Sequence, residues 1–210
     1  MKIESPYSEA ITGCSFLFYE FERILPLLMQ PDADKLLKDE IEENKILQVN
    51  NRKARRTFVL EFKRRFQSVP YSFWEAWKGW SEESKRAGLF YAILKTYKLV
   101  FDFHFNVTLK HWNSIDHTVL KSDLMMEFNE IAGRDEFVNS WSDNTKDRCA
   151  SHYLTILRQT GLLTDKTNEL KAVHPDDSEL AYYFLSGETW FLEALLLLPY
   201  EINAIKEKLS

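Results

Sequence analysis

The feature that most constrains the fold is one helical pattern in which aromatic and basic side chains fall on opposite faces. Phe58, Phe62 and Phe66 recur every four residues, which places them along one stripe of an α-helix. Asn50 or Asn51 comes just before the pattern and supplies a side-chain oxygen able to cap the new helix. The opposite face is basic, and its members are Arg52, Lys53, Arg55, Arg56, Lys63, Arg64 and Arg65.

This segment reverses the charge balance of the chain. Residues 51–65 hold seven of the 27 lysines and arginines and one of the 32 acidic residues, so their net charge is +6. The rest of the chain has a net charge of −11, and the whole chain −5. A polyanion would be attracted to this pole. The alternative is an ordinary solvated helix face, but four cations within residues 52–56 crowd a helix end that is already partially positive.

The composition predicts a mainly α-helical, cytoplasmic protein. Of its 210 residues 45% are apolar and 14% aromatic, with only six glycines and six prolines, which argues against a loop-rich β protein. Cys14 and Cys149 have no pairing or metal-binding spacing, so we expect packed, reduced thiols. We find neither a secretory signal nor an apolar span of roughly 18 residues, and therefore expect no membrane segment.

Residues 1–68 are expected to form a three-helix unit. The helices are predicted over residues 12–29, 33–44 and 51–66, with Asp32 as a plausible cap of the second. A short helix, a turn and a helix with a cationic start predict a helix-turn-helix of the kind that reads DNA.

Residues 69–118 are expected to form an aromatic-rich helical core and connector. Three tryptophans recur at a three-residue interval, a spacing more typical of packing than of a ligand cage: Trp74, Trp77 and Trp80. Residues 82–113 favour helix, although residues 100–107 alternate with the period of a strand.

Residues 119–210 are expected to form a winged-helix-like unit within a mainly α bundle. Gly133 should end one helix and Gly161 should cap another. The predicted elements are helices over residues 122–131, 135–141 and 142–159, a β hairpin about Asp165–Asn168 as the wing, and terminal helices over residues 176–186 and 188–209. The helix from residue 142 starts with the same N-x-K-x-R pattern as the basic helix, a faint internal echo.

No motif of a catalytic, metal or cofactor site is present. The chain lacks HExxH and C-x-x-C pairs, the G-x-S-x-G elbow and the glycine-rich phosphate loops. Cys149 and His152 lie three apart on a predicted helix, which is more typical of packing than of a shared metal ligand. We therefore expect a protein that is not an enzyme and has no cofactor.

Several ordered blocks of residues carry a family resemblance. They are Tyr7-Ser8-x-x-Ile11-Thr12-Gly13, Ile41-Glu42-Glu43-Asn44-x-x-Leu47-Gln48, Phe62-x-x-Arg65-Phe66, Trp141-Ser142-x-x-Thr145 and Leu157-x-x-x-Gly161-Leu162-Leu163. Together they resemble the BrxA family of the BREX bacteriophage-exclusion systems. The resemblance implies a largely helical, non-enzymatic component of an anti-phage operon that binds double-stranded DNA. The family is also similar in shape to the antitermination factor NusB, which makes RNA an alternative ligand. The aromatic segment Phe101–Trp112 lies outside these blocks.

The predicted DNA surface combines both helix starts and the wing. Its residues are Asn50, Asn51, Arg52, Lys53, Arg55, Arg56, Lys63, Arg64, Arg65, Asn144, Lys146, Arg148 and Lys166. The acidic remainder predicts weak, salt-sensitive binding with little sequence choice. The second hypothesis is a protein-interaction or scaffolding subunit whose basic helix docks on an acidic partner from the same operon. The sequence leaves the oligomeric state open.

Overall fold

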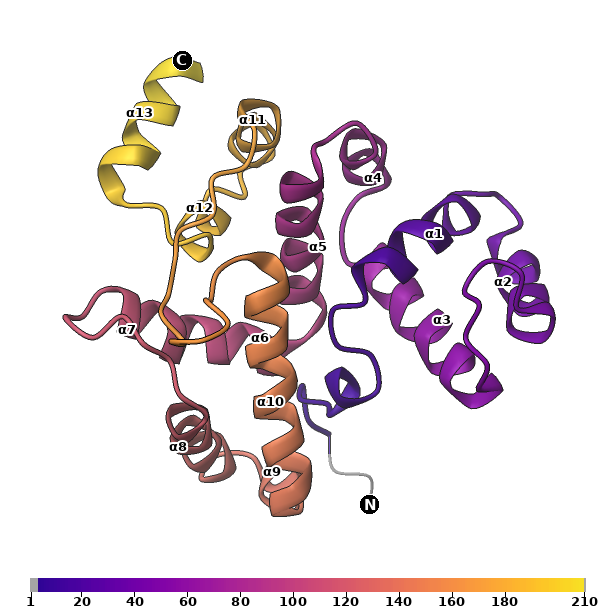
Figure 1. Cartoon of the computed structure of the whole chain (residues 1–210), viewed down its shortest axis with the longest axis horizontal. Coiled ribbons are helices and arrows are strands. Elements are labelled where there is room, and N and C mark those ends of the chain that lie inside the picture. The colour runs from indigo at the N-terminus through magenta and orange to yellow at the C-terminus, as the bar shows by residue number, and fades with distance from the viewer. Residues whose placement is uncertain (1–3, 210) are drawn as a thin grey trace.

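The computed structural model describes residues 4–209 and is mainly α-helical, as the sequence predicts. Figure 1 shows α1 to α4 on one side of the molecule and the later helices grouped around α5 and α10. The helices of the first part are α1 Phe18–Leu28, α2 Ala33–Glu43, α3 Arg52–Gln67, α4 Tyr71–Trp77 and α5 Glu82–Thr96. Those of the second part are α6 Lys98–Phe103, α7 Leu109–Trp112, α8 Lys121–Ala132, α9 Glu136–Asn139, α10 Asp143–Thr160, α11 Asp177–Leu185, α12 Trp190–Ala194 and α13 Pro199–Leu209.

The first helix starts later than predicted. A 3₁₀ turn, η1 (Ala10–Thr12), is followed by a non-helical stretch, and Leu17 has a left-handed φ of 51° just before α1. The reason is a contact with α3: the Arg65 guanidinium donates hydrogen bonds to the carbonyl oxygens of Cys14, Ser15 and Phe16. Those carbonyls therefore do not accept bonds from an earlier start of the helix.

The tryptophan stripe is packing, as predicted. Trp74 and Trp77 are buried, and their indole nitrogens donate to the carbonyl oxygens of Phe66 and Lys85 at 2.9 and 2.8 Å. Gly88 lets α5 approach this layer, since a Cβ there would lie 2.8 Å from Cδ1 of Trp77. The layer joins α4 to α5, which runs through the middle of the molecule (Figure 1).

The aromatic segment after α5 is helical, so the alternative of a strand over residues 100–107 is wrong. α6 passes into a π-helical turn, η2 (His104–Thr108), and then into α7. The buried imidazole of His104 bonds the Tyr153 hydroxyl at 3.0 Å and the carbonyl oxygen of Ala194 at 2.8 Å. Burial lowers the pKa of His104 to about 4, so the ring is a neutral core group.

The C-terminal helices follow the prediction except at the end of the chain. α8, α9 and α10 form as expected, and Gly161 ends α10 with a φ of 93°. The single helix predicted over residues 188–209 is instead α12 and α13. Leu195, Leu196 and Leu197 are all buried, and the Leu195 carbonyl accepts a bond from the Val173 amide at 3.0 Å. The chain does not continue as one helix here because Leu196 has a left-handed φ of 64°.

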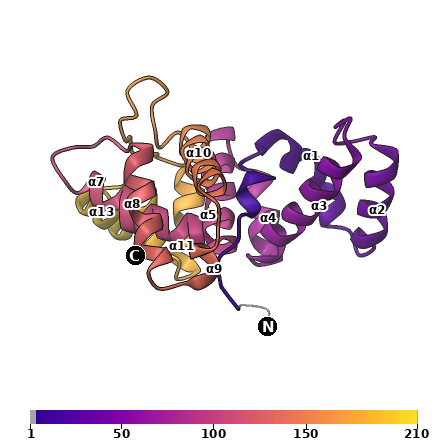
Figure 2. The ribbon, with the colours of Figure 1, turned by 90° about the horizontal axis from the view of Figure 1, so that it is seen from below.

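The predicted wing is a hydrogen-bonded loop. Residues 162–171 fold back on themselves, with the Thr164 amide donating to the Glu169 carbonyl and the Lys171 amide to the Leu162 carbonyl, both at 3.0 Å. The described residues contain isolated bridges here, not strands. Figure 2 shows this orange loop projecting from the body of the molecule.

Buried residues of all three predicted segments, 1–68, 69–118 and 119–210, belong to one hydrophobic cluster. The boundaries between these segments stay a prediction.

Candidate nucleic-acid interface

The N-terminal end of α3 is built by hydrogen bonds from residues that precede it. The Asn51 side chain accepts a bond from the Ala54 amide at 3.1 Å, so Asn51 is the cap. The turn before it is fixed by the buried Glu40 carboxylate, which accepts bonds from the amides of residues 45, 46 and 47. Residues 44–51 separate α2 from α3, a longer connection than the roughly three or four residues of a DNA-reading helix-turn-helix.

Two of the predicted contact residues are structural. Arg55 is buried and donates to the carbonyl oxygens of Ile41 at 2.8 Å and Val49 at 2.6 Å. Arg65 is completely buried, holds the segment before α1 and lies 5.5 Å from the Tyr97 ring. Neither guanidinium is exposed to solvent, so the prediction that Arg55 and Arg65 contact DNA is wrong.

A sequence signal for their burial existed. Arg55 precedes Phe58 by three residues, and Arg65 follows Phe62 by three. Residues three apart share a helix face, so both arginines lie beside the aromatic stripe and not opposite it. The hydrogen bonds of Arg55 to carbonyl oxygens thus offset part of the cation crowding at the start of this helix without a bound anion.

Three of the five remaining basic residues of α3 form an exposed stripe. Lys53, Arg56 and Arg64 follow the helical spacing, and Lys53 and Arg64 are about 16 Å apart along the axis. Leu60, 51% exposed, lies between them. We call these four residues the α3 stripe.

The basic residues of α3 differ in their acidic neighbours. Arg52 makes a bidentate pair with Glu42, and Lys63 pairs with Asp34 on α2. Arg64 pairs with the buried Glu61 at 2.9 Å. Within residues 4–209, Lys53 and Arg56 have no carboxylate at ion-pair distance. The two cations with most freedom to meet an anion therefore stand at the start of α3. Asn50 is exposed beside them, and its carbonyl accepts a bond from Arg55.

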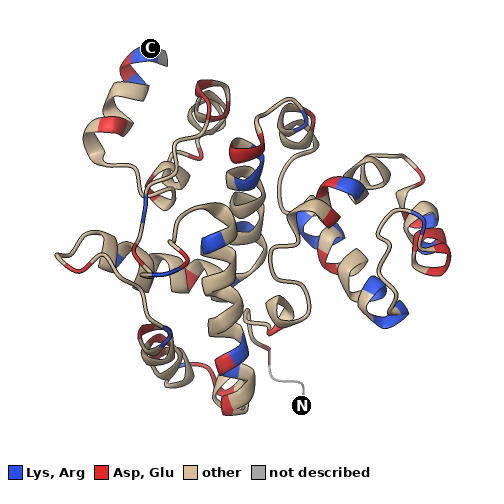
Figure 3. Cartoon of the chain, in the orientation of Figure 1, with Lys and Arg blue, Asp and Glu red and all other residues tan. Residues whose placement is uncertain are grey.

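The start of α10 repeats the capped end but not its charge. Ser142 is the cap and accepts a bond from the Thr145 amide at 3.2 Å, which leaves Asn144 exposed in the first turn. Lys146 is half-buried, and the exposed Arg148 donates to the Thr12 carbonyl at 3.2 Å. Asp143 and Asp147 share this end, and Asp147 pairs with Lys121 at 2.5 Å. Figure 3 shows blue concentrated at the start of α3, but red and blue side by side at the start of α10.

The 3₁₀ turn η1 and the residue after it lie between α10 and α3. η1 packs on α10, where Thr12 accepts the bond from Arg148. The next residue, Gly13, packs on α3 so closely that a Cβ there would lie 3.1 Å from Cγ2 of Thr57. η1 and Gly13 therefore connect Arg148 of α10 with Thr57 in the second turn of α3. Lys166 is exposed on the projecting loop and belongs to neither helix.

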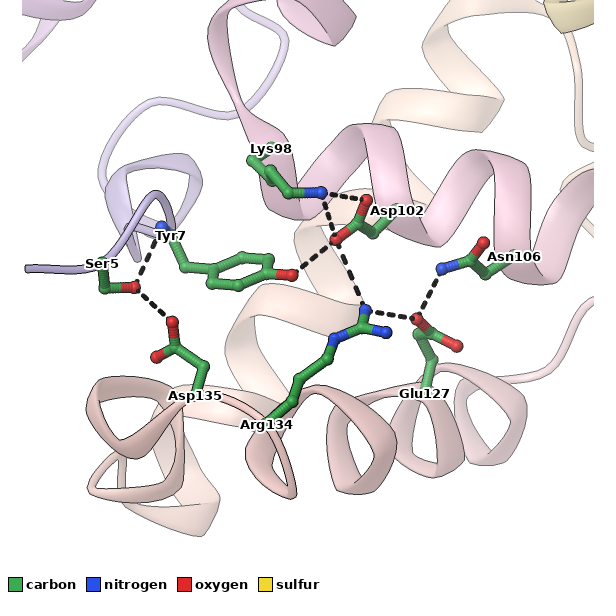
Figure 4. Close-up of polar contacts among 8 residues, drawn as sticks. All are labelled: Ser5, Tyr7, Lys98, Asp102, Asn106, Glu127, Arg134 and Asp135. Carbon is green, nitrogen blue, oxygen red and sulfur yellow. Dashed lines mark hydrogen bonds and ion pairs between the residues drawn. The ribbon is translucent and has the colours of Figure 1, made fainter.

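Sequence reasoning missed a second polar cluster, drawn in Figure 4, that fastens the N-terminal arm (residues 4–9). The Tyr7 hydroxyl donates to the buried Asp102 carboxylate at 2.7 Å, and burial together with this bond raises the pKa of Tyr7. Lys98 and Arg134 approach the same carboxylate at 2.7 and 3.8 Å. Ser5 donates to Asp135 at 2.9 Å. Lys98 and Asp102 are four residues apart on α6, but Tyr7 and Ser5 lie far from their partners in the sequence, which offers no local signal for the anchoring of the arm.

The cysteines and histidines form no metal site in the part of the chain that the structure describes. No group of three potential ligands occurs there. Cys14 and Cys149 are free and buried, and burial raises their pKa values to about 11 and about 12, so both are unreactive thiols. Among the described helices, none has the length and apolar character needed to span a bilayer.

Two comparisons with known proteins identify the same family. The family model BrxA matches residues 5–182. A BREX protein BrxA of Bacillus cereus (strain H3081.97) is 25% identical over 173 residues, which cover 82% of this chain and 86% of the relative. The crystal structure of an uncharacterized protein from Magnetospirillum magneticum superposes with a TM-score of 0.78 at 21% identity, covering 91% of this chain and 98% of that one. The last comparison concerns the fold alone.

Proposed function

The chain belongs to the BrxA family of BREX phage-defence systems, and from this premise we propose that it is a non-enzymatic accessory protein that binds double-stranded DNA through the start of α3. The proposal keeps Lys53, Arg56 and Arg64 as phosphate contacts, with Arg52 beside them. Arg148, across η1, is the nearest basic residue of α10 that the contacts connect to this surface.

The observation that carries the proposal is the exposure of Lys53 and Arg56 at a capped helix N-terminus, without ion-pair partners in the described chain. The end of a helix of this length bears partial positive charge, and phosphates are the anions that such ends commonly meet. Protein–DNA contacts of this type position the duplex without reading bases. The net charge of −5 for the whole chain supports weak binding that depends steeply on salt.

The test is the affinity for an unrelated blunt DNA duplex as a function of salt. Lys53→Glu/Arg56→Glu removes two contacts, so the slope of log affinity on log salt should fall by about 1.8. Lys35→Glu/Lys38→Glu on α2 is the matched control, since it reverses two exposed cations at the same spacing on a neighbouring helix. The control should lose only the smaller, general attraction of net charge.

Three outcomes would contradict the proposal. One is the absence of duplex binding by the wild type at low salt, with capture of an acidic protein of the operon instead. Another is an equal loss of affinity in the α3 variant and the control. The third is tighter binding of an RNA duplex of the same sequence through the same residues, which would make RNA the ligand.

A further inference from the structure

A hollow outside the proposed duplex surface joins aromatic rings to cations. It has a volume of about 530 Å³ and lies between the N-terminal arm, the junction of α5 with α6, and the loop before α12. Its walls include Pro6, Lys95, Lys98, Phe101 and Trp190. We call it the aromatic hollow.

A smaller hollow of about 330 Å³ connects it to the α3 stripe. Lys95 and Thr96 line both hollows, and the smaller one also includes Arg64. A chain of cations therefore runs from α3 to the aromatic hollow by way of Arg64, Lys95 and Lys98. Arg64 is thus the member of the α3 stripe at which a strand held by Lys53 and Arg56 would meet the smaller hollow.

The aromatic side of the hollow is rigid and partly open. Phe101 stacks on Phe105 with ring centroids 4.3 Å apart, and Trp190 lies 5.9 Å from each ring. All three side chains are half-buried, and behind them Trp190 packs 5.8 Å from the buried Tyr91 ring. The rings are thus fixed from the inside while part of their surface is exposed. A fixed, partly exposed ring surface is a platform on which a planar base can stack.

Two of the cations along this path, Lys98 and Arg64, pair with more deeply placed carboxylates, whereas Lys95 pairs with Glu188, which also lines the aromatic hollow and is similarly exposed, 29% against 24%. The Lys98 ammonium is 2.7 Å from Asp102, with 45% of the lysine side chain exposed against 7% of the aspartate (Figure 4). Arg64 has 50% exposed against 5% for Glu61. Lys95 is 2.5 Å from Glu188, whose second oxygen accepts a bond from the Trp190 indole. At Lys98 and Arg64 the group offered to solvent is therefore chiefly the cation, and the Glu188 carboxylate is engaged by Lys95 and by the Trp190 indole.

We propose that the aromatic hollow binds an unpaired nucleotide of a DNA strand, with its base against Trp190 and Phe101 and its phosphate at Lys98 and Lys95. This inference rests on the proposed function, because the nucleotide belongs to a strand that leaves a duplex held at α3. Arg64 meets the phosphate between the two sites.

The chemistry of the hollow favours a nucleotide over other occupants. An acidic peptide would satisfy the lysines and leave the ring surfaces without a partner, and a lipid chain would bury charged walls at a cost. A nucleotide joins a flat base to an anionic phosphate, and this combination matches aromatic rings that lie beside cations. The volume falls within the range of small-molecule sites, roughly 300–1,000 Å³.

The experiment compares two DNA duplexes in the full-length protein. One is blunt, and the other has a short single-stranded overhang that contains 2-aminopurine, a base whose fluorescence falls on stacking. Wild type should bind the overhang duplex roughly fivefold or more tightly than the blunt one. Its 2-aminopurine fluorescence should decrease on binding.

Variants separate the hollow from the duplex surface. Lys98→Gln and Trp190→Leu should lose the gain and the quenching but keep the affinity for the blunt duplex. Trp190→Phe retains a ring and should keep most of the gain. Lys110→Gln and Tyr200→Leu change an exposed lysine and an exposed aromatic elsewhere, and both should behave as wild type. Lys98→Gln keeps Phe101, Phe105 and Trp190 in place and removes only the ammonium, which also lies 5.5 Å from the Tyr7 ring, so it decides the matter if Trp190→Leu fails to fold.

The proposal is overturned if the overhang gives wild type no gain, or if Lys98→Gln retains the full gain and quenching. It is also overturned if free adenosine monophosphate binds in the hollow while the overhang adds nothing, since the site would then take a free nucleotide. The proposed function fails separately: a protein that binds the overhang strand but no blunt duplex retains the hollow and loses the α3 surface.

Discussion

The starts of α3 and α10 are built alike and charged differently. Each helix begins after a side-chain cap, Asn51 or Ser142, and each opens with an N-x-K-x-R pattern. At α3 the exposed cations Lys53 and Arg56 face solvent without a paired carboxylate in the described chain. At α10, Asp143 and Asp147 neutralise the same kind of end, and Arg148 bonds a backbone carbonyl.

Two helices that begin with the same cap geometry and the same sequence pattern therefore do not present the same surface charge. What distinguishes the two ends is where the neighbouring acids and carbonyls lie. The position of carbonyl oxygens also distinguishes the arginines within α3. Arg56 is exposed, whereas Arg55 and Arg65 donate their hydrogen bonds to backbone carbonyl oxygens.

The largest effect should come from Arg65, which has no equivalent in α10. Arg65→Met leaves the buried carbonyl oxygens of Cys14 and Phe16 without a donor, so the free energy of unfolding should fall by about 3 kcal/mol or more. Arg56→Met removes an exposed charge of the same helix that has no ion-pair partner among the described residues, and it should cost about 0.5 kcal/mol or less. Urea unfolding of both variants checks this. Equal losses would show that Arg65 is not the structural residue described.

The next effect separates the two helix starts in DNA binding. Lys53→Glu/Arg56→Glu should reduce the salt slope by about 1.8, whereas Lys146→Glu/Arg148→Glu should reduce it by less than about 0.9. The reason is that the α10 residues already lie among carboxylates. Fluorescence anisotropy with one duplex at several salt concentrations measures both. A larger loss in the α10 variant would reverse the comparison.

The two caps should contribute equally to stability. Asn51→Ala and Ser142→Ala each remove the bond to the amide three residues later, and each should lower the free energy of unfolding by about 1 kcal/mol. Asn144→Ala, exposed and not the cap, is the control and should stay within about 0.5 kcal/mol of wild type. Thermal unfolding is sufficient. A cap effect at only one helix would mean that the two ends differ in construction as well as charge.

The smallest effect should come from converting the α10 start into a copy of the α3 start. Asp143→Asn/Asp147→Asn leaves Lys146 and Arg148 without acidic neighbours in the first turns, so duplex affinity should rise a few-fold at low salt. The gain should disappear at high salt because it is electrostatic. An affinity that stays unchanged at low salt would indicate that the duplex does not approach α10.

Much of the fold could be predicted from local patterns. Spacing of apolar residues located the helices. Cap chemistry located one helix end at Gly161 and narrowed two starts to Asn50 or Asn51 and to Ser142, Asp143 or Asn144, of which the structure selects Asn51 and Ser142. The late start of α1 and the split between α12 and α13 could not be predicted, because both depend on bonds to distant segments, from Arg65 and to Val173. A local pattern contains no information on such partners.

The candidate site divides in the same way. The basic character of the α3 start was evident from the sequence, whereas the pairing of Arg52 with Glu42 and the joining of α3 to α10 through η1 depend on tertiary contacts. The cluster around Asp102 was invisible for the same reason, since Tyr7 and Lys98 meet only in the fold.

The most direct test of the central claim is lysine footprinting of the wild-type protein with and without a blunt duplex. Acetylation of each lysine is read by mass spectrometry at low salt. We predict strong protection of Lys53 by the duplex, weaker protection of Lys146, and no change at Lys35 or Lys38. If Lys53 reacts equally with and without DNA while Lys146 or Lys166 becomes protected, the duplex does not bind at the start of α3.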